Sequence, residues 1–478
     1  MTRTSFLHCA FALLAIGAAS AAVPAEKMEL KYSFGPRPLA GHTAVKPEEA
    51  YNVNRGYGFD LGSKVQVVTR EGADPLAAGF VTGENGRPFF FSTKLDPGAY
   101  RVTVTLGDTS AEAVTTVKSE TRRLMLEAVY TPAGKTSQHT FLVHVRVPRM
   151  PGGGMVALKA REKEPILHLQ WDENDDRTRM PFLELDWDEK LTLEFSDAHP
   201  ALCAIEIATA ENPTTVYLVG DSTMTDQMME PWGAWGQMFP RWFKPPVLIA
   251  NYAESGESAR SFIAERRWAK LMSEIHPGDF VLIQFGINDR NGTSLEQFKQ
   301  FFVQFIKDTR DHGATPVLVT SQNLRRLDEN GKGVQTLGGF PDAMRAVAQE
   351  QNALLLDLNA ASMTLYEAIG AADLPKAFVD GTHQNSYGAY ELAKCVVNLA
   401  VAAKLPWTQH LVDDWKPFDP AHPDPIATFR LPRDPQLDPA RPGGPGAPGR
   451  RGPMGGDPPR STAPSPARNS SSTSSDRK

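Results

Sequence analysis

The first half of the chain alternates short apolar runs with turn residues. Segments such as "SKVQVVT", "AYRVTVTLGD" and "KLTLEFSD" place apolar and polar side chains on opposite faces with a period of two, which is typical of β-strands. The tripeptide Asp96-Pro97-Gly98 predicts a tight turn, because proline presets one backbone dihedral and glycine accepts positive φ. We therefore expect an all-β sandwich over residues 28–210.

After residue 212 the pattern changes to that of an α/β domain. Buried runs rich in Val, Ile and Leu alternate with amphipathic stretches such as "SLEQFKQFFVQFIKDTRDHG". The five runs occupy residues 216–219, 247–251, 280–285, 317–320 and 354–358. Strands joined by helical crossovers pair in parallel, so the pattern predicts a doubly wound five-stranded parallel sheet over residues 213–416.

The two ends of the chain differ from both regions. The N-terminus has Arg3, an apolar stretch over residues 6–16 and then small residues, which is the pattern of a secretory signal peptide over residues 1–22. From residue 417 to 478, Pro, Gly, Ser and Arg dominate, and such a composition predicts a disordered tail. We expect a protein that is exported to the periplasm or the extracellular space.

Charge and cysteine content narrow the class of protein. The formal charge of −6 gives no support for nucleic-acid binding, and no later segment reaches the roughly 20 apolar residues of a membrane span. Cys203 and Cys395 lie in apolar segments of different regions, which predicts two buried free thiols. No spacing typical of metal ligands is present, so we expect neither a metal nor another cofactor. The sequence gives no indication of the oligomeric state.

Polar residues that a sheet core does not require follow the predicted strands or precede the last helix. They are Ser222 in "GDST", Gly256 in "AESGES", Asn288 in "FGIND", and the pair Asp380 and His383 in "DGTHQ". Singly, each has an ordinary explanation: a turn, a loop glycine, an Asx turn of Asn288-Asp289 that caps the next helix, or a surface histidine. Together, in this order, they predict a site at the carboxyl edge of the sheet.

These residue types fill the roles that acyl transfer requires. Ser222 would be the nucleophile, His383 its base, and Asp380 the group that orients the imidazole. The backbone N–H groups of Ser222 and Gly256 and the side-chain amide of Asn288 would bind the oxyanion. A rival serine, Ser258, lacks the second glycine of a nucleophile elbow and is rejected.

The same motifs resemble those of the SGNH or GDSL hydrolases, whose four blocks carry Ser, Gly, Asn and His. Within that superfamily, the sequence motifs are most similar to those of rhamnogalacturonan acetylesterases. The motifs that carry this resemblance are "GDST", "WGAWGQMFP", "SARSF", "FGIND" and "DGTHQNSYGAYELA". The resemblance implies a flavodoxin-like three-layer sandwich and makes Arg325 and Arg326 candidate substrate contacts. Ile287 departs from the family, since many relatives have a histidine there. The N-terminal region resembles galactose-binding-like sandwiches through "YGFDLG", and its aromatic run at 89–91 could be core or a sugar-stacking face.

The resemblance implies a secreted serine esterase that removes acetyl groups from pectin, most specifically from rhamnogalacturonan, through an acyl-enzyme. Two alternatives stay open. The same chemistry could act on another ester, such as acetylated xylan, peptidoglycan or a lipid. The chain could also be a carbohydrate-binding protein with a silent α/β domain, although four intact site residues argue against that.

Overall fold

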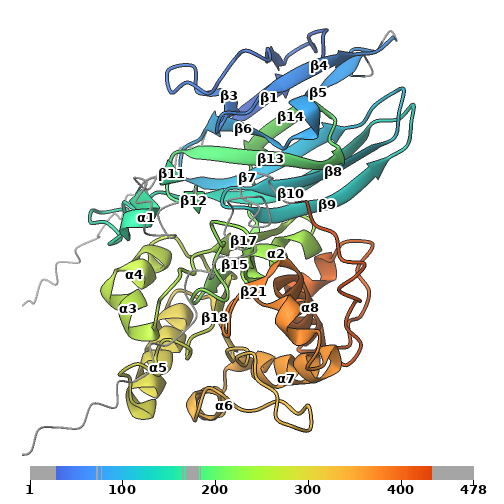
Figure 1. The fold of residues 1–478 in the computed structure, drawn as a ribbon. Coiled ribbons are helices and arrows are strands. Elements are labelled where there is room, and N and C mark those ends of the chain that lie inside the picture. The colour runs from blue at the N-terminus through green and yellow to red at the C-terminus, as the bar shows by residue number, and fades with distance from the viewer. Residues whose placement is uncertain are drawn as a thin grey trace, which may run out of the picture.

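The computed structural model describes residues 28–432, except for residues 72–73, 77, 164–165, 168–181 and 184. The predicted signal peptide and residues 433–478 of the predicted tail lie outside the described residues. Figure 1 shows a β-sandwich packed on an α/β domain. In the described part of the chain, no helix is long and apolar enough to cross a membrane.

The N-terminal sandwich consists of two sheets. The seven-stranded sheet contains β1 (Glu29–Ser33), β2 (Thr43–Ala44), β4 (Val65–Thr69), β5 (Gly79–Gly83), β7 (Gly98–Leu106), β10 (Ser137–Val145) and β14 (Leu202–Thr209). The five-stranded sheet has the order β3 (Tyr57–Asp60), β6 (Phe89–Lys94), β13 (Lys190–His199), β8 (Ala113–Ser119) and β9 (Arg123–Thr131). A short helix, α1 (Ala160–Lys163), and a two-stranded ribbon of β11 (Ile166–Leu167) and β12 (Phe182–Leu183) follow β10. The predicted all-β sandwich is confirmed.

The inward faces of the two sheets form one apolar core. Phe89 and Phe91 of β6 are at most 1% exposed and pack with Val102, Val104 and Phe195. Phe90 is buried separately, against Leu185. All three aromatic side chains of the run are therefore buried and do not form a surface for stacking sugars. Cys203 in β14 and Cys395 in the last helix are both buried free thiols, as predicted.

The α/β domain contains a five-stranded parallel sheet. Its order is β17 (Val247–Asn251), β15 (Thr214–Val219), β18 (Phe280–Ile283), β19 (Thr315–Val319) and β20 (Leu354–Leu356). The first strand, β15, lies inside the sheet between β17 and β18, so the strand order reverses beside it, which is the doubly wound arrangement. The predicted fold class is confirmed. Because all five strands run in the same direction, their carboxyl ends meet at one edge.

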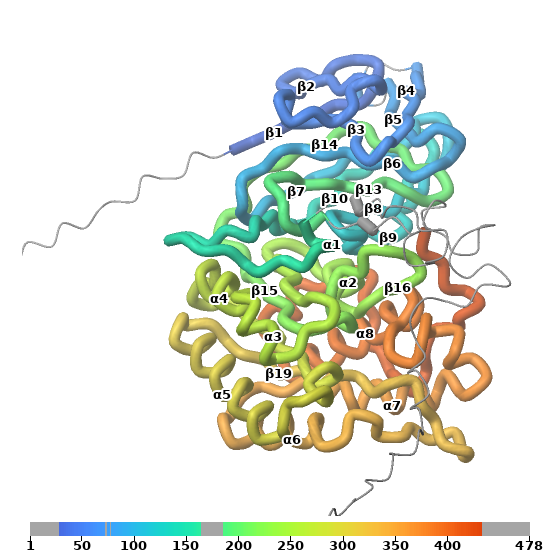
Figure 2. The backbone as a smooth tube through the Cα atoms, turned by 60° about the vertical axis from the view of Figure 1, so that its left-hand side comes forward, coloured from blue at the N-terminus to red at the C-terminus, as the bar shows by residue number. Residues whose placement is uncertain are grey.

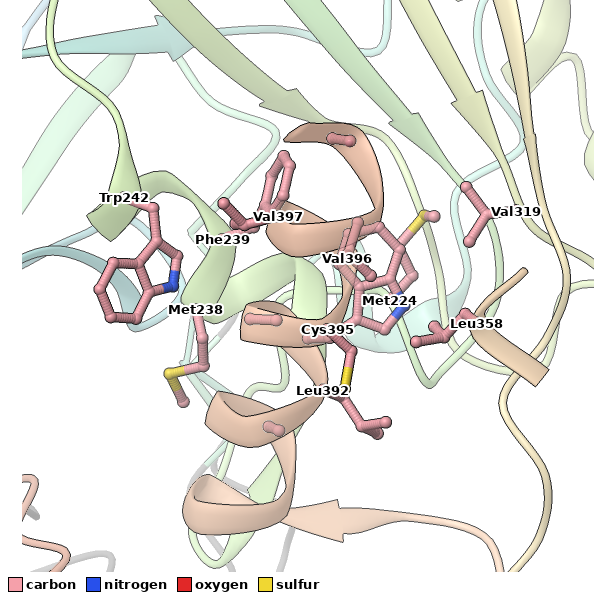
Figure 3. Close-up of a cluster of buried hydrophobic side chains, with 14 of the residues drawn as sticks. Met224, Met238, Phe239, Trp242, Val319, Leu358, Leu392, Cys395, Val396 and Val397 are labelled. Carbon is pink, nitrogen blue, oxygen red and sulfur yellow. The ribbon is translucent and has the colours of Figure 1, made fainter. Parts of the chain in front are cut away.

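Helices cover both faces of this sheet and give it three layers. One face is covered by α3 (Ala259–Ala264), α4 (Arg267–Met272), α5 (Leu295–Asp311) and α6 (Phe340–Glu350). The other packs on α2 (Trp235–Met238), α7 (Leu358–Ile369) and α8 (Ser386–Ala402). Figure 3 shows part of the apolar core on this second face of the sheet. It contains Leu392, Cys395, Val396 and Val397 of α8, together with Phe239 of the 3-10 helix η3 (Phe239–Trp242).

Ion pairs and one apolar side chain join the two domains. Leu124 of β9 is fully buried in the hydrophobic core of the α/β domain. Beside it, Arg123 donates to Asp226 at 2.6 and 2.9 Å and to Asp186 at 2.8 Å, and all three side chains are at most 5% exposed. Arg122 pairs with Glu230 in the same way. The sandwich is therefore part of the folded unit around the α/β domain.

The chain after residue 416 differs from its prediction. Phe418 is buried against the core that contains α8, and Ile426, Phe429 and Leu431 are partly buried there. This segment continues to the sandwich, where Lys118 donates to the Pro432 carbonyl at 3.1 Å. Figures 1 and 2 show it running from the α/β domain to β9. The expectation of disorder from residue 417 is thus wrong for residues 417–432, because spaced apolar side chains anchor a segment of disorder-like composition.

Candidate active site

Ser222 lies in the tight turn that follows β15, an interior strand of the parallel sheet. Gly220 opens the turn, and a Cβ atom there would come within 2.9 Å of the Gln284 carbonyl oxygen, so only glycine fits without displacing the neighbouring strand. Asp221 Oδ1 accepts hydrogen bonds from the Thr223 N–H and hydroxyl groups at 2.9 and 2.7 Å. These contacts fix the backbone on both sides of Ser222.

His383 and Asp380 lie in the loop before α8 and meet Ser222 across 161 residues of sequence. His383 Nε2 is 2.9 Å from Ser222 Oγ, and His383 Nδ1 is 2.8 Å from Asp380 Oδ2. The other carboxylate oxygen of Asp380 accepts the N–H groups of Thr382 and His383, both at 2.7 Å. Burial acts to raise the pKa of Asp380, but the hydrogen bonds and charge of His383 outweigh it and hold this pKa below its ordinary value. Asp380 is therefore an anion that can hold the imidazole in one orientation.

The three predicted donors lie at the ends of adjacent strands. Gly256 follows β17 with a φ of +82°, which favours glycine, and Asn288 follows β18. The Asn288 side-chain amide donates one hydrogen bond to the Glu257 carbonyl at 2.8 Å and retains a second N–H. Within the described residues, the backbone N–H groups of Ser222 and Gly256 donate to no protein acceptor. The structure thus brings donors from three strand ends to the edge that holds Ser222.

Asp289 joins the loop that follows β17 to the loop that follows β18. Its Oδ1 accepts the Ala259 N–H and its Oδ2 the Gly286 N–H, both at 3.0 Å. Burial raises the pKa of Asp289 to about 7. The ordinary alternative, in which Asn288-Asp289 caps the following helix, does not hold for the Asp289 side chain. It accepts the N–H of Ala259, the first residue of α3, which precedes it in the sequence, whereas Ser294 is the N-cap of α5.

The other candidate residues have separate positions. The Arg325 N–H donates to the Gly381 carbonyl at 3.0 Å, in the loop that carries His383. Arg325 is half-buried and Arg326 exposed, and neither guanidinium has a partner among the described residues. Ser258 is the N-cap of α3 in a capping box with Ser261, which accounts for it without chemistry. Ile287 is buried, at 4% exposed.

Sequence patterns missed three side chains that hold these loops. Gln227 donates to the Ser222 carbonyl at 2.5 Å, and Lys159 and Arg161 from the sandwich side of the chain reach the Gly256 loop. Contacts between distant segments leave no local spacing to find. Gln227 alone lies close to a recognised motif, five residues after Ser222.

The match to known families agrees with this geometry. Residues 218–389 match the GDSL-like lipase/acylhydrolase family, and residues 30–141 match the galactose-binding-like domain of β-agarase/YXIM esterase-like proteins. Rhamnogalacturonan acetylesterase RhgT of Bacillus subtilis (strain 168) is 40% identical over 222 residues, which cover 42% of this chain and 96% of RhgT.

A second relative extends over both domains. The uncharacterized esterase YxiM of Bacillus subtilis (strain 168) is 25% identical over 403 residues, covering 80% of this chain and 94% of YxiM. The crystal structure of the YxiM protein of Bacillus subtilis aligns with a TM-score of 0.41 at 23% identity, over 79% of this chain and 99% of that one. From the family match, the RhgT relative and the fold described above, this chain belongs to the GDSL-like lipase/acylhydrolase family and is a carboxylic ester hydrolase, with a galactose-binding-like domain at its N-terminus.

Proposed function

We propose that this protein is an acetylesterase that removes O-acetyl groups from rhamnogalacturonan through an acyl-enzyme on Ser222. The hydrogen-bonded chain from Ser222 Oγ through His383 to Asp380, with distances of 2.9 and 2.8 Å, carries the proposal. The 40% identity to a rhamnogalacturonan acetylesterase supports the substrate. The predicted export signal fits a polymer that lies outside the cell.

In the first step, Ser222 Oγ attacks the acetyl carbonyl carbon and its proton moves to His383 Nε2. Asp380 keeps the Nδ1–H of the imidazole directed at itself and stabilises the imidazolium. The tetrahedral adduct then collapses, the bond between the acyl carbon and the sugar oxygen breaks, and His383 gives the proton to that oxygen. The sugar leaves with a free hydroxyl group, and Ser222 is acetylated.

In the second step, water takes the place of the sugar. His383 Nε2 accepts a proton from the water as its oxygen attacks the acyl carbon. Ser222 Oγ then leaves and recovers a proton from His383, and acetate is released. In both steps the negative oxygen is stabilised by the N–H groups of Ser222, Gly256 and Asn288, and losing one such donor typically costs about a hundred- to a thousandfold in rate.

The cations beside the catalytic loop support an acidic polymer as substrate. Arg325 is hydrogen-bonded through its backbone to the loop of His383, and the guanidinium groups of Arg325 and Arg326 have no partner among the described residues. Guanidinium pairs readily with carboxylate in a bidentate geometry. The carboxylates of galacturonate residues flanking the acetyl ester would provide such partners.

The test is acetate release from acetylated rhamnogalacturonan, acetylated xylan and acetylated peptidoglycan. We expect release from rhamnogalacturonan that falls to background in Ser222→Ala. Ser258→Ala is the matched control, because it removes a hydroxyl from a neighbouring loop and costs only a helix cap, about 1 kcal/mol of stability.

Three outcomes would contradict parts of the proposal. Preference for xylan or peptidoglycan would contradict rhamnogalacturonan as the proposed substrate. Activity that survives Ser222→Ala would contradict the assignment of Ser222 as the nucleophile. Binding of the polymer without turnover, unchanged by Ser222→Ala, would make the chain a carbohydrate-binding protein.

A further inference from the structure

The chain that leaves the sandwich after β10 crosses onto the α/β domain. The Ala157 N–H donates to the Glu265 carbonyl at 2.9 Å, and Lys270 donates to the Arg149 carbonyl at 2.9 Å. Figure 1 shows the helix at its end, α1, beside α4. This segment, residues 146–163, thereby brings two cations to the loop after β17.

Both cations bind the same backbone oxygen. Lys159 Nζ donates to the Ser255 carbonyl at 2.6 Å, and Arg161 Nη2 donates to the same oxygen at 2.6 Å. Each is also paired with a buried carboxylate of the loop, Lys159 with Glu257 and Arg161 with Glu254. Two positive charges therefore converge on one carbonyl group.

The peptide that carries this carbonyl also carries the Gly256 N–H. A trans peptide is planar, so its C=O and N–H bonds point in opposite directions. Fixing the oxygen from one side fixes the direction of the N–H on the other. Donors bound to a carbonyl oxygen also polarise the peptide, which makes its N–H a stronger donor.

We propose that Lys159 and Arg161 are positioning residues for ester hydrolysis: they clamp the Ser255 carbonyl so that the Gly256 N–H is aimed at, and strengthened toward, the oxyanion. This inference rests on the proposed role of Gly256 as an oxyanion donor. It makes residues 146–163, which connect β10 to later strands of the sandwich, a part of the catalytic machinery of the α/β domain.

An ordinary ion-pair contact between domains would explain the pairs with Glu254 and Glu257, but not the shared carbonyl. A purely structural contact has no need to place both cations on the peptide that precedes Gly256. Lys159 Nζ also lies 3.7 Å from where a Cβ on Gly256 would stand, so the charge is adjacent to the proposed donor. If the contact is only structural, loss of the cation should leave transition-state stabilisation unchanged. If the cations clamp the Ser255 carbonyl, loss of one should weaken it.

The experiment separates the bond to Ser255 from the ion pair to Glu257. Lys159→Met removes the charge and keeps the length of the side chain. Lys159→Met with Glu257→Gln also removes the carboxylate that would otherwise be left buried without its partner, and Glu257→Gln alone leaves the lysine in place. Lys159→Arg is the conservative variant. Turnover of p-nitrophenyl acetate is measured in all of them, together with the affinity for a boronic acid that forms an anionic tetrahedral adduct on Ser222.

For the double variant we expect kcat to fall about ten- to a hundredfold, with KM changed by less than about threefold, since part of one oxyanion donor's effect is lost. Affinity for the boronic acid should fall by a similar factor. Lys159→Arg should recover most of both losses, and Arg161→Met should lower kcat in the same direction. A kcat within about twofold of wild type in the double variant, or a loss confined to KM, would overturn the clamp.

Arg70→Met is the matched control for stability. Arg70 is 25% exposed and paired with the buried Asp108 inside the sandwich, much as Lys159 is 24% exposed and paired with the buried Glu257. We expect it to lower thermal stability without changing kcat; an equal loss of kcat would make the effect of Lys159 a general one and overturn the clamp. If the wild type neither hydrolyses the ester nor binds the boronic acid, the proposed function fails and the clamp with it. If the wild type does both and the variants match it, only the clamp fails.

Discussion

At the scale of single residues, chemistry determined what could be predicted. A nucleophile, a base, an orienting acid and oxyanion donors are limited to a few residue types, so Ser222, Asp380 and His383 could be selected from short motifs, and the structure places them in one hydrogen-bonded chain. Lys159 and Arg161 could not be selected, because a lysine or arginine in a loop is usually solvated and the peptide they bind is about a hundred residues away. The role of Asp289 was also hidden, since its partners lie on other loops.

Asp289 gives a prediction about pH. Its folded pKa of about 7 lies above the value of about 4 in an unfolded chain, so the folded protein holds this proton more tightly. A raised carboxyl pKa contributes stability that is present at low pH and is lost as pH rises from about 4 to about 7. We expect wild type to lose stability relative to Asp289→Asn over this window, by at most about 1.4 kcal/mol per pH unit.

Urea unfolding of both proteins at pH 4.5, 5.5 and 7 measures this difference. Asp413→Asn is the control, because it removes a carboxylate whose side chain is 93% exposed. A difference between wild type and Asp289→Asn that stays constant over the window would contradict a raised pKa.

At the scale of elements, periodicity predicted the strands well and their ends less well. The fifth apolar run was predicted over residues 354–358, but β20 ends at Leu356 and α7 begins at Leu358. Asp357 separates the two by accepting the Ala360 N–H as a helix cap. In the run "LLLDL" this cap is surrounded by leucines, so the apolar pattern continues through the boundary.

The prediction of disorder after residue 416 was the larger error. The packing of this segment can be tested by mutation. Phe429 packs its ring against Tyr387 and Tyr390 of α8, with centroids 5.6 and 5.4 Å away. We expect Phe429→Ala to lower the free energy of unfolding by about 1–2 kcal/mol, since the ring is partly buried. Lys416→Ala, at the exposed position just before this segment, should change it by less than about 0.5 kcal/mol. Equal stability of the two variants in urea unfolding would show that the segment does not pack in solution.

At the scale of the whole molecule, the sequence predicted two domains but not how they join. Arg122 of the turn between β8 and β9 and Arg123, the first residue of β9, reach the α/β domain, where they pair with Glu230 and Asp226. Nothing in an alternating β-pattern marks a turn as an interface, because turns are expected to be polar. Asp226 is four residues after Ser222, so the interface begins just after the turn that holds Ser222.

Removing Arg123 should therefore destabilise both domains at once. Arg123→Met leaves Asp226 buried without its cation, and breaking such a pair typically costs about 3–5 kcal/mol. We expect a single unfolding transition by calorimetry, shifted to lower temperature, and partial recovery when Asp226→Asn is added. A sandwich that unfolds in a separate transition, while the α/β transition stays in place, would contradict this coupling.

The buried ion pairs between the domains also predict which residues related esterases carry. RhgT aligns with 42% of this chain, whereas YxiM aligns with 80% of it and therefore extends over both domains. An acid at the position of Asp226 or Glu230 would be costly to bury in a protein without the arginines of the sandwich. We therefore expect these two acids to be inherited together with Arg122 and Arg123. An esterase gene fragment that begins just before the serine at the position of Ser222 would then still reveal, by these acids, whether a sandwich preceded it.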